Sequence, residues 1–283
     1  MKYIYLIYLY FLWILKKITG IRSYGIGVIT SIVKKEFLFY FNNSVFIFSP
    51  NAGRSYGFLP IGRPNEPGTH IFLNKIIKKY TNIVFIDIGA SIGEFAISMA
   101  SVREVKKVIA IEPQPETRAA LLRSFQLIEK EKYEVLEYGI SDYNGIGKFE
   151  INSKAPMGAR IASLKENIET IDVTIKRLDD CVNLKNTDDN LIILIDIEGG
   201  ELMAIRGAKN IIKKYSPLII FEYNDSTKKY FSLDDMRSEI PNYSLYNLDN
   251  ENGELILDLD RTWNIVALPN NGVWNNIVND KFF

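Results

Sequence analysis

Three carboxylates follow a long apolar run in the second half of the chain. Residues 191–195 read Leu-Ile-Ile-Leu-Ile, and Asp196, Glu198 and Glu201 come next, with a Gly-Gly pair between the last two. Such a run is typical of a central strand in a parallel sheet. Ligands of open α/β sheets bind beyond the carboxyl ends of the strands, so acids gathered there point to chemistry. The pattern predicts a base for a substrate hydroxyl, an anchor for polar substrate groups, or oxygen ligands for a divalent metal.

The third of these acids has a second interpretation. Glu201 precedes a predicted helix over residues 202–214, and an acid near the amino end of a helix is stabilising. We keep both interpretations for Glu201 and predict catalytic roles for Asp196 and Glu198. Glu222 ends the next predicted strand and is the third predicted catalytic acid.

A glycine turn follows a predicted strand over residues 83–88. Gly89 allows a positive φ and close backbone approach, and the helix predicted over residues 94–102 would present free N–H donors to a ligand. Asp87, two residues before the first glycine, suits an amine-bearing cation such as S-adenosylmethionine (SAM) better than a pyrophosphate. The predicted cofactor-binding residues of this segment are Asp87, Gly89, Ala90, Ser91 and Gly93.

Glu112 comes about twenty residues past that turn, after a predicted strand over residues 107–111. An acid there can accept hydrogen bonds from both ribose hydroxyls of an adenosine, and Pro113 ends the strand. NAD enzymes use the same device, so Glu112 does not choose between SAM and NAD. A dinucleotide fingerprint needs G-x-G-x-x-G, however, and Ser91 stands where its middle glycine belongs. The glycine spacing thus favours SAM, but an NAD(P)-dependent oxidoreductase stays as an alternative because Glu112 is compatible with both cofactors.

A third predicted strand, residues 133–140, ends at Ser141 and Asp142. We predict that both contribute to the cofactor site, with Asp142 approaching the adenine amino group. The alternative is a simple turn, because Asp, Asn and Gly are the residues that a β-turn needs. Two further extended segments are predicted over residues 147–151 and 172–176.

The chain resembles the FkbM-type SAM-dependent methyltransferases. The resemblance covers about residues 66 to 269 and rests on an ordered set of segments typical of that family. These are Asp87-Ile88-Gly89-Ala90-Ser91-Ile92-Gly93, Ile111-Glu112-Pro113-Gln114-Pro115, Leu178-Asp179-Asp180, Ile195-Asp196-Ile197-Glu198-Gly199-Gly200-Glu201, Gly207-Ala208 and Glu222. Two positions depart from the family pattern: Ser91 replaces its usual Asn, and Leu194 replaces its usual Lys.

The resemblance implies O-methylation of a hydroxyl on a sugar, a glycan or a secondary metabolite. In the expected reaction the hydroxyl attacks the methyl group of SAM, and a carboxylate of Asp196, Glu198 or Glu222 takes its proton. Asp87 and Gly89 would hold the methionine part of the cofactor. A non-catalytic module with the same fold is a further alternative. No metal is predicted, although a divalent cation is compatible with the acids.

The implied architecture is α/β: a Rossmann-like class I methyltransferase fold with a mostly parallel seven-stranded sheet. Short runs over residues 243–248, 254–257 and 263–268 predict an antiparallel hairpin at its C-terminal end. We expect an N-terminal extension over residues 1–65 and a methyltransferase domain over residues 66–283.

Composition narrows the class of partner. The formal net charge is zero, so electrostatics gives no reason to expect nucleic-acid binding. The single cysteine, Cys181, agrees with a cytoplasmic protein. Residues 3–15 are continuously apolar and Lys16-Lys17 follow. This segment is compatible with a helix packed on protein, with peripheral membrane contact through residues 3–17, or with a spanning anchor. The acceptor is expected to be a small molecule or glycan, and no oligomeric state is predicted.

The region before the first strand supplies the remaining candidates. Arg54, Tyr56 and Glu66 are candidates for lining the active site. His70 is the only histidine, and we expect a helix-capping or surface role for it rather than catalysis.

Overall fold

The computed structural model describes residues 11, 35–41, 44–58, 66–150, 170–186 and 188–277. Apart from Phe11, the apolar N-terminal segment lies outside these residues, so its three interpretations stay predictions. Among the described residues, no helix is both long enough and apolar enough to cross a membrane.

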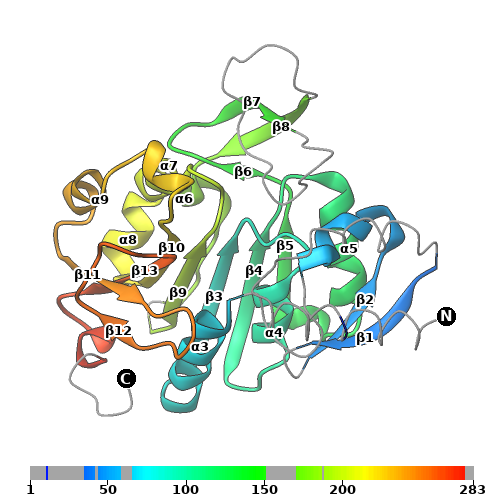
Figure 1. The fold of residues 1–283 in the computed structure, drawn as a ribbon, viewed down its shortest axis with the longest axis horizontal. Helices are drawn as coiled ribbons and strands as arrows, with labels where there is room; N and C mark the ends of the chain where they lie inside the picture. The colour runs from blue at the N-terminus through cyan, green and yellow to red at the C-terminus, as the bar shows by residue number, and fades with distance from the viewer. Residues whose placement is uncertain are drawn as a thin grey trace.

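The central feature is an eight-stranded sheet (Figure 1) in the order β12-β11-β13-β10-β9-β3-β4-β5. β10, β9, β3, β4 and β5 are parallel neighbours, whereas β13 runs antiparallel to both β10 and β11. The predicted α/β fold with a C-terminal antiparallel hairpin is confirmed, and the eighth strand is the two-residue β12. The strands are β3 (Ile83–Ile88), β4 (Val105–Ile111), β5 (Tyr133–Leu136), β9 (Asn190–Ile195), β10 (Leu218–Glu222), β11 (Tyr243–Leu248), β12 (Leu255–Ile256) and β13 (Asn264–Pro269).

Helices cover both faces of this sheet because the side chains of each strand alternate between two apolar cores. Phe85 and Ile192 point into one core, and Ile86 and Ile193 point into the other. The first core is completed by α3 (Pro67–Lys79), α4 (Glu94–Ala100) and α5 (Pro115–Phe125). The second is completed by α6 (Leu178–Cys181), α7 (Glu201–Arg206), α8 (Lys209–Tyr215) and α9 (Leu233–Glu239).

Two smaller sheets flank the main one (Figure 1). β1 (Phe37–Phe41) and β2 (Ser44–Phe48) form a hairpin that packs on α5. β6 (Gly139–Ile140), β8 (Thr170–Lys176) and β7 (Gly145–Glu150) form a three-stranded sheet beyond the end of the main sheet. Short 3-10 helices cover Pro50–Phe58, Lys130–Lys132, Thr227–Lys229 and Val273–Asn276.

The elements differ from the predictions at a few places. The strand predicted over residues 133–140 divides after Leu136, and its last two residues join β8 instead. The helix predicted over residues 202–214 divides at Gly207, where a Cβ would lie 2.0 Å from the carbonyl oxygen of Ser141. The apolar spacing of residues 116–130 predicts an amphipathic helix with Leu121, Leu122 and Phe125 facing inward, but α5 ends at Phe125. Leu121 and Phe125 are buried, whereas Leu122 is exposed, so the prediction for Leu122 was wrong.

Candidate functional site

The glycine turn after β3 has the backbone geometry that its residues predict. Gly89 has φ +86°, and a Cβ on it would lie 1.9 Å from the carbonyl oxygen of Asp196. The turn and the end of β9 therefore touch through backbone atoms, and a side chain at residue 89 would separate them. Gly93 has φ +94° at the start of α4, and Ser91 adopts φ 50° between the two glycines.

Glu112 braces this turn. Its Oε2 accepts a hydrogen bond from the backbone N–H of Ser91 at 2.9 Å, and its Oε1 accepts from the N–H of Gln114 at 2.7 Å. Burial raises the pKa of Glu112 to about 7, against the opposing effect of these two amides. A carboxylate has about four acceptor positions, so both oxygens keep capacity for further donors.

A pocket of about 320 Å³ opens beside this carboxylate at the carboxyl edge of the sheet. Eight of the predicted site residues line it: Gly89, Ser91, Glu112, Pro113, Ser141, Asp142, Asp196 and Glu198. The volume falls in the range of small-molecule sites. One pocket thus connects the predicted cofactor side with two of the three predicted catalytic acids.

Four other predicted residues lie outside the lining. Ala90 and Gly93 shape the turn, and Glu222 lies next to the lining acids, as described below. Asp87 is 1% exposed, and its Oδ2 is buried with no hydrogen-bond partner. Burial raises the pKa of Asp87 to about 8, although the backbone N–H of Ala96 favours its charged form.

The three predicted catalytic acids lie together. One carboxylate oxygen each from Asp196, Glu198 and Glu222 lies within 4.8 Å of the other two. Strand register explains this, because Phe221 pairs with Ile195, so Glu222 and Asp196 leave their parallel strands at the same level. Glu198 returns toward them on a turn with φ 56°.

Mutual repulsion adds to desolvation in this cluster. Burial, and then the charge of Glu222, raise the pKa of Asp196 well above its usual value. Burial, and then the charge of Glu198, raise the pKa of Glu222 to about 9. The carboxyl groups of Asp196 and Glu222 therefore bind protons more tightly than isolated acids do.

Glu201 holds the loop that carries two of these acids. Its Oε1 accepts from the backbone N–H groups of Ile197 and Gly199, each at 3.1 Å, and the side chain is fully buried. It is also the first residue of α7. The structure thus gives Glu201 a positioning role for the loop in addition to its place at the helix start.

The start of α3 closes the other side of the acid cluster. Glu66 accepts from Trp263 Nε1 at 3.1 Å and from Asn264 Nδ2 at 2.5 Å, and its charge raises the pKa of Asp196 and Glu222. His70 is 4% exposed and contacts Glu94 through Nε2 at 3.0 Å. The surface role expected for His70 was therefore wrong.

Tyr56 does not reach this site. It donates to the carbonyl oxygen of Ile47 at 2.9 Å and packs in the first core, so the expectation that it lines the active site was wrong. The side chain of Arg54 lies outside the described residues.

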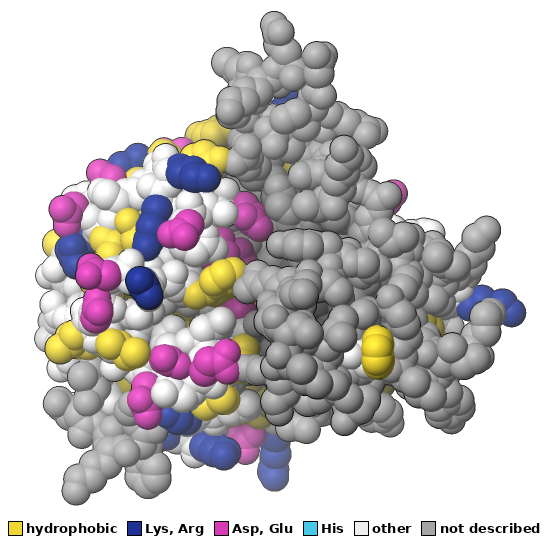
Figure 2. Space-filling view, in the orientation of Figure 1, with side chains coloured by type: hydrophobic (Ala, Val, Ile, Leu, Met, Phe, Trp, Pro, Cys, Tyr) yellow, Lys and Arg dark blue, Asp and Glu magenta, His cyan; other side chains and the backbone are white. Residues whose placement is uncertain are grey.

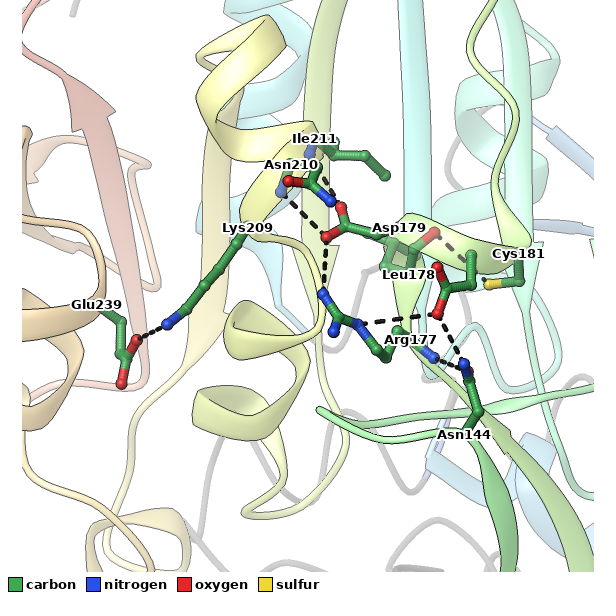
Figure 3. Close-up of polar contacts among 10 residues, drawn as sticks. Asn144, Arg177, Leu178, Asp179, Cys181, Lys209, Asn210, Ile211 and Glu239 are labelled. Carbon is green, nitrogen blue, oxygen red and sulfur yellow. Dashed lines mark hydrogen bonds and ion pairs between the residues drawn. The ribbon is translucent and has the colours of Figure 1, made fainter.

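Another acid-rich segment is structural (Figure 3). Asp179 accepts from the backbone N–H groups of Asn210 at 3.0 Å and Ile211 at 2.9 Å, and Arg177 contacts the same carboxylate. The neighbouring Asp180 accepts from the Asn144 amide at 2.7 Å. This segment therefore fastens α8 and the small sheet to each other, away from the pocket.

Several lining residues were missed in the sequence. They are large or polar side chains: Gln114, Thr117, Tyr138, Tyr143, Phe149, Met203 and Tyr230. Gln114 lies within a segment typical of the family but was not chosen as a site residue, and the others lie outside the motifs. Tyr230 packs directly on Gly199, where a Cβ would lie 2.3 Å from its ring. Phe149 lies in β7 of the small sheet, and Tyr143 lies in the turn between β6 and β7. The pairing of β6, β7 and β8 brings both to the pocket.

The described surface visible in Figure 2 intersperses lysine and arginine with aspartate and glutamate. This mixture agrees with the balanced composition of the chain, which carries 34 residues of each sign.

Leu194, which replaces the usual family Lys, is 3% exposed in the first core and pairs with Asp87 across the strands. An apolar side chain therefore fills the place beside that buried acid.

Solved structures with a similar arrangement include three of low identity. The methyltransferase FkbM from Methylobacillus flagellatus KT is 17% identical, with a TM-score of 0.48 over 78% of this chain and 55% of that chain. The putative transferase PH0793 from Pyrococcus horikoshii is 13% identical, with a TM-score of 0.42 over 83% and 71%. TYW2 from M. jannaschii, solved in complex with AdoMet, is 11% identical, with a TM-score of 0.40 over 82% and 84%.

No curated protein matches the chain. This chain spans about half the length of the FkbM structure named above. The model of the methyltransferase FkbM domain, however, matches residues 87–248, which is more than half of this chain. The match begins at Asp87 and includes Glu112, Asp196 and Glu222, the acids around which the site is built. The chain therefore belongs to the FkbM methyltransferase family.

Proposed function

We propose that the protein is a SAM-dependent methyltransferase that methylates a hydroxyl group of a sugar, glycan or other small metabolite. The observation that carries the proposal is the single pocket that joins Glu112 and the Gly89 turn to Asp196 and Glu198. A cofactor half and an acceptor half in one cavity are what group transfer requires.

The residues of the cofactor half fit SAM. Glu112 faces the pocket with spare acceptor capacity for the ribose hydroxyls, and Gly89 keeps the turn free of side chain. The buried Oδ2 of Asp87 lacks a donor, which an ammonium group near the turn would supply directly or through water. When bound, SAM supplies a methyl group activated for displacement.

The acceptor half has the groups to bind and deprotonate a hydroxyl. Asp196 and Glu198 line the pocket, and Glu222 lies against them. A carboxylate with a raised pKa is a stronger base once ionised, and general bases work best near the working pH. Glu201 fixes the direction of this loop through its two backbone contacts. We assign Asp196 as the group that takes the acceptor proton, with Glu198 and Glu222 binding polar groups of the acceptor.

Calorimetric titration of the purified chain with S-adenosylhomocysteine, with NAD in parallel, tests the cofactor. We expect micromolar binding of S-adenosylhomocysteine that falls at least about tenfold in Glu112→Ala, because the ribose would lose a charged acceptor. Glu137→Ala is the matched control, since Glu137 is an exposed acid that pairs with Arg118. Binding of NAD alone would favour the oxidoreductase, and binding of neither would favour a non-catalytic module.

Transfer from radiolabelled SAM to a panel of hydroxylated acceptors tests the chemistry. Asp196→Ala and Glu198→Ala should abolish transfer and leave the affinity for S-adenosylhomocysteine within a few-fold. Wild-type turnover in both variants would remove their catalytic assignment.

A further inference from the structure

We infer that Asp196, Glu198 and Glu222 together bind a divalent cation of the kind that prefers oxygen ligands: Mg²⁺, Mn²⁺ or Ca²⁺. The inference deepens the proposed function and rests on it for the role of the ion. Binding of the ion itself can be measured without any methyl transfer.

The spacing of the oxygens is the first observation. Each acid offers one oxygen, and all three oxygens lie within 4.8 Å of one another. Two ligands of one ion can be no farther apart than twice the metal–oxygen distance, about 4.2 Å for Mg²⁺ and about 4.6–5.2 Å for Ca²⁺. The oxygens are therefore close enough for one Ca²⁺ or Mg²⁺ ion to draw all three together through small side-chain adjustments, which are larger for Mg²⁺.

The backbone fixes the positions from which the three acids converge. Asp196 and Glu222 leave adjacent parallel strands at the same level, and such strands lie about 4.8 Å apart. Glu198 is held on its turn because Glu201 accepts from the N–H groups on both sides of it. Two ligands are therefore set by the sheet and the third by a braced loop.

The second observation concerns Glu222 alone. This side chain is 6% exposed, and its Oε1 accepts from the Asn224 amide at 2.5 Å. Its Oε2 is buried and has no hydrogen-bond partner among the residues that the structure describes. A buried carboxylate oxygen that gains no donor is costly, and coordination of a cation would satisfy it.

Charge is the third observation. Among the described residues, no lysine, arginine or histidine forms an ion pair with Asp196 or Glu222. Glu66 and Glu201 add further negative charge around these two acids. Glu239 shows the contrasting arrangement, because Arg206 and Lys209 contact its carboxylate at 2.7 and 3.0 Å. A divalent cation would compensate the charge of Asp196 and Glu222.

The position of the ion suggests its use. Asp196 and Glu198 line the pocket that we assign to cofactor and acceptor. A bound cation there would orient an acceptor oxygen and lower the pKa of its hydroxyl group. This lowering would offset the weaker basicity of Asp196 when that carboxylate also coordinates the ion. Acceptors with two neighbouring hydroxyls, such as sugar diols, fit such a site best because both oxygens can reach one ion.

Titration of the chelator-treated full chain with Mn²⁺, followed by the electron paramagnetic resonance of free Mn²⁺, tests the inference. We expect one ion per chain, displaced by Mg²⁺ or Ca²⁺ and not by an equal ionic strength of NaCl. Glu222→Gln and Asp196→Asn should each weaken Mn²⁺ binding at least about tenfold, since each removes a charged ligand. Glu239→Gln, which alters a paired acid elsewhere, should bind as the wild type does.

S-adenosylhomocysteine titration of the same samples separates the failures. Absence of stoichiometric Mn²⁺ binding in a chain that binds S-adenosylhomocysteine would overturn the metal site and leave the proposed function standing. Mn²⁺ binding that is equally strong in Glu222→Gln, Asp196→Asn and Glu198→Gln would overturn it as well. Mn²⁺ binding without S-adenosylhomocysteine binding would support the metal site and contradict the proposed function. A variant that unfolds is identified by circular dichroism and replaced by another of these three.

Discussion

The carboxylates in the two halves of the pocket, which we assign to the cofactor and to the acceptor, differ in their hydrogen-bond partners. On the cofactor side, both oxygens of Glu112 accept backbone N–H groups, so this acid is already organised. On the acceptor side, Glu222 has a buried oxygen without a donor, and its neighbours are acids. The hydrogen bonds of Glu112 are thus supplied within the chain, whereas the acid cluster requires a proton, a cation or a substrate to balance its charge. Asp87 is the exception on the side that we assign to the cofactor, because its Oδ2 is also buried without a described donor.

The pKa values of Glu112 and Glu222 differ for the same reason. Backbone amides oppose the effect of burial at Glu112 and keep its pKa at about 7. Neighbouring acids reinforce the effect of burial at Glu222 and raise its pKa to about 9. The halves touch where Gly89 meets the carbonyl group of Asp196, so a change there should disturb both.

The largest effect is expected for Gly89→Ala. The new Cβ would lie 1.9 Å from the Asp196 carbonyl oxygen at φ +86°, so the turn and β9 must separate. We expect destabilisation by about 3 kcal/mol or more and loss of S-adenosylhomocysteine affinity by at least about 100-fold. Chemical denaturation and calorimetry measure the two effects.

Gly272→Ala is the matched control for that change. Gly272 has φ +93° and ψ −167°, and no atom of the described residues lies within 4 Å of its Cβ position. Gly272→Ala should cost only the backbone strain, about 1–3 kcal/mol, with unchanged affinity. Equal effects at both positions would mean that the contact between the halves is unimportant.

The pH dependence of stability in Glu222→Gln tests the difference between the two halves of the pocket. The folded protein holds a proton on Glu222 up to about pH 9, whereas the unfolded chain releases it near the ordinary pKa of 4.5. Between these values the folded state binds more protons, so its stability falls as pH rises. We expect the Tm of the metal-free protein to fall between pH 5 and pH 9, and to fall less steeply in Glu222→Gln.

Glu239→Gln gives the opposite pattern. Arg206 and Lys209 hold the pKa of Glu239 below its usual value, so its contribution to stability is constant above the ordinary pKa and lost only in acid. The substitution should lower the Tm by a similar amount from pH 5 to pH 9 and leave the slope unchanged. An unchanged slope in Glu222→Gln would contradict the high pKa of that group.

Asp179→Ala should separate a structural acid from the chemical ones. This side chain accepts two backbone N–H groups at the start of α8, so its loss is expected to cost about 1–3 kcal/mol of unfolding free energy. Affinity for S-adenosylhomocysteine should stay within about twofold. Asp180→Ala, which removes a side chain that is 46% exposed, should cost less than about 1 kcal/mol. A larger loss of affinity than of stability in Asp179→Ala would argue against the structural role.

The smallest effect is expected for Ser91→Asn. Ser91 has φ 50°, a left-handed conformation that Asn adopts more readily than Ser. Its backbone N–H still donates to Glu112 in the variant, so affinity should change by less than about threefold. Denaturation should show a gain of up to about 1 kcal/mol. A loss of stability would mean that the pocket cannot accommodate the longer side chain.

Local patterns were sufficient for much of the fold. Apolar runs marked all the strands of the main sheet, and β3 and β11 have the bounds that were predicted. The patterns failed where a tertiary contact interrupts a run. Gly207, in a run predicted as one helix, instead ends α7 against the Ser141 carbonyl group. α9 was not predicted at all, although Ser232 and Asp235 form a capping box at its start.

The sequence by itself determined that Gly89, Glu112 and Asp196 meet at one pocket, because each follows a strand and parallel strands end at one edge. Only the tertiary structure decided the state of these acids. Register places Glu222 beside Asp196, and the start of α3 brings Glu66 to the cluster. Strand β7 supplies Phe149, and the turn before it supplies Tyr143. Burial, hydrogen-bond partners and charge depend on contacts between residues far apart in the chain. For this reason local patterns locate the carboxylates, whereas three-dimensional packing sets their pKa values and decides which carboxylate oxygens have a hydrogen-bond partner.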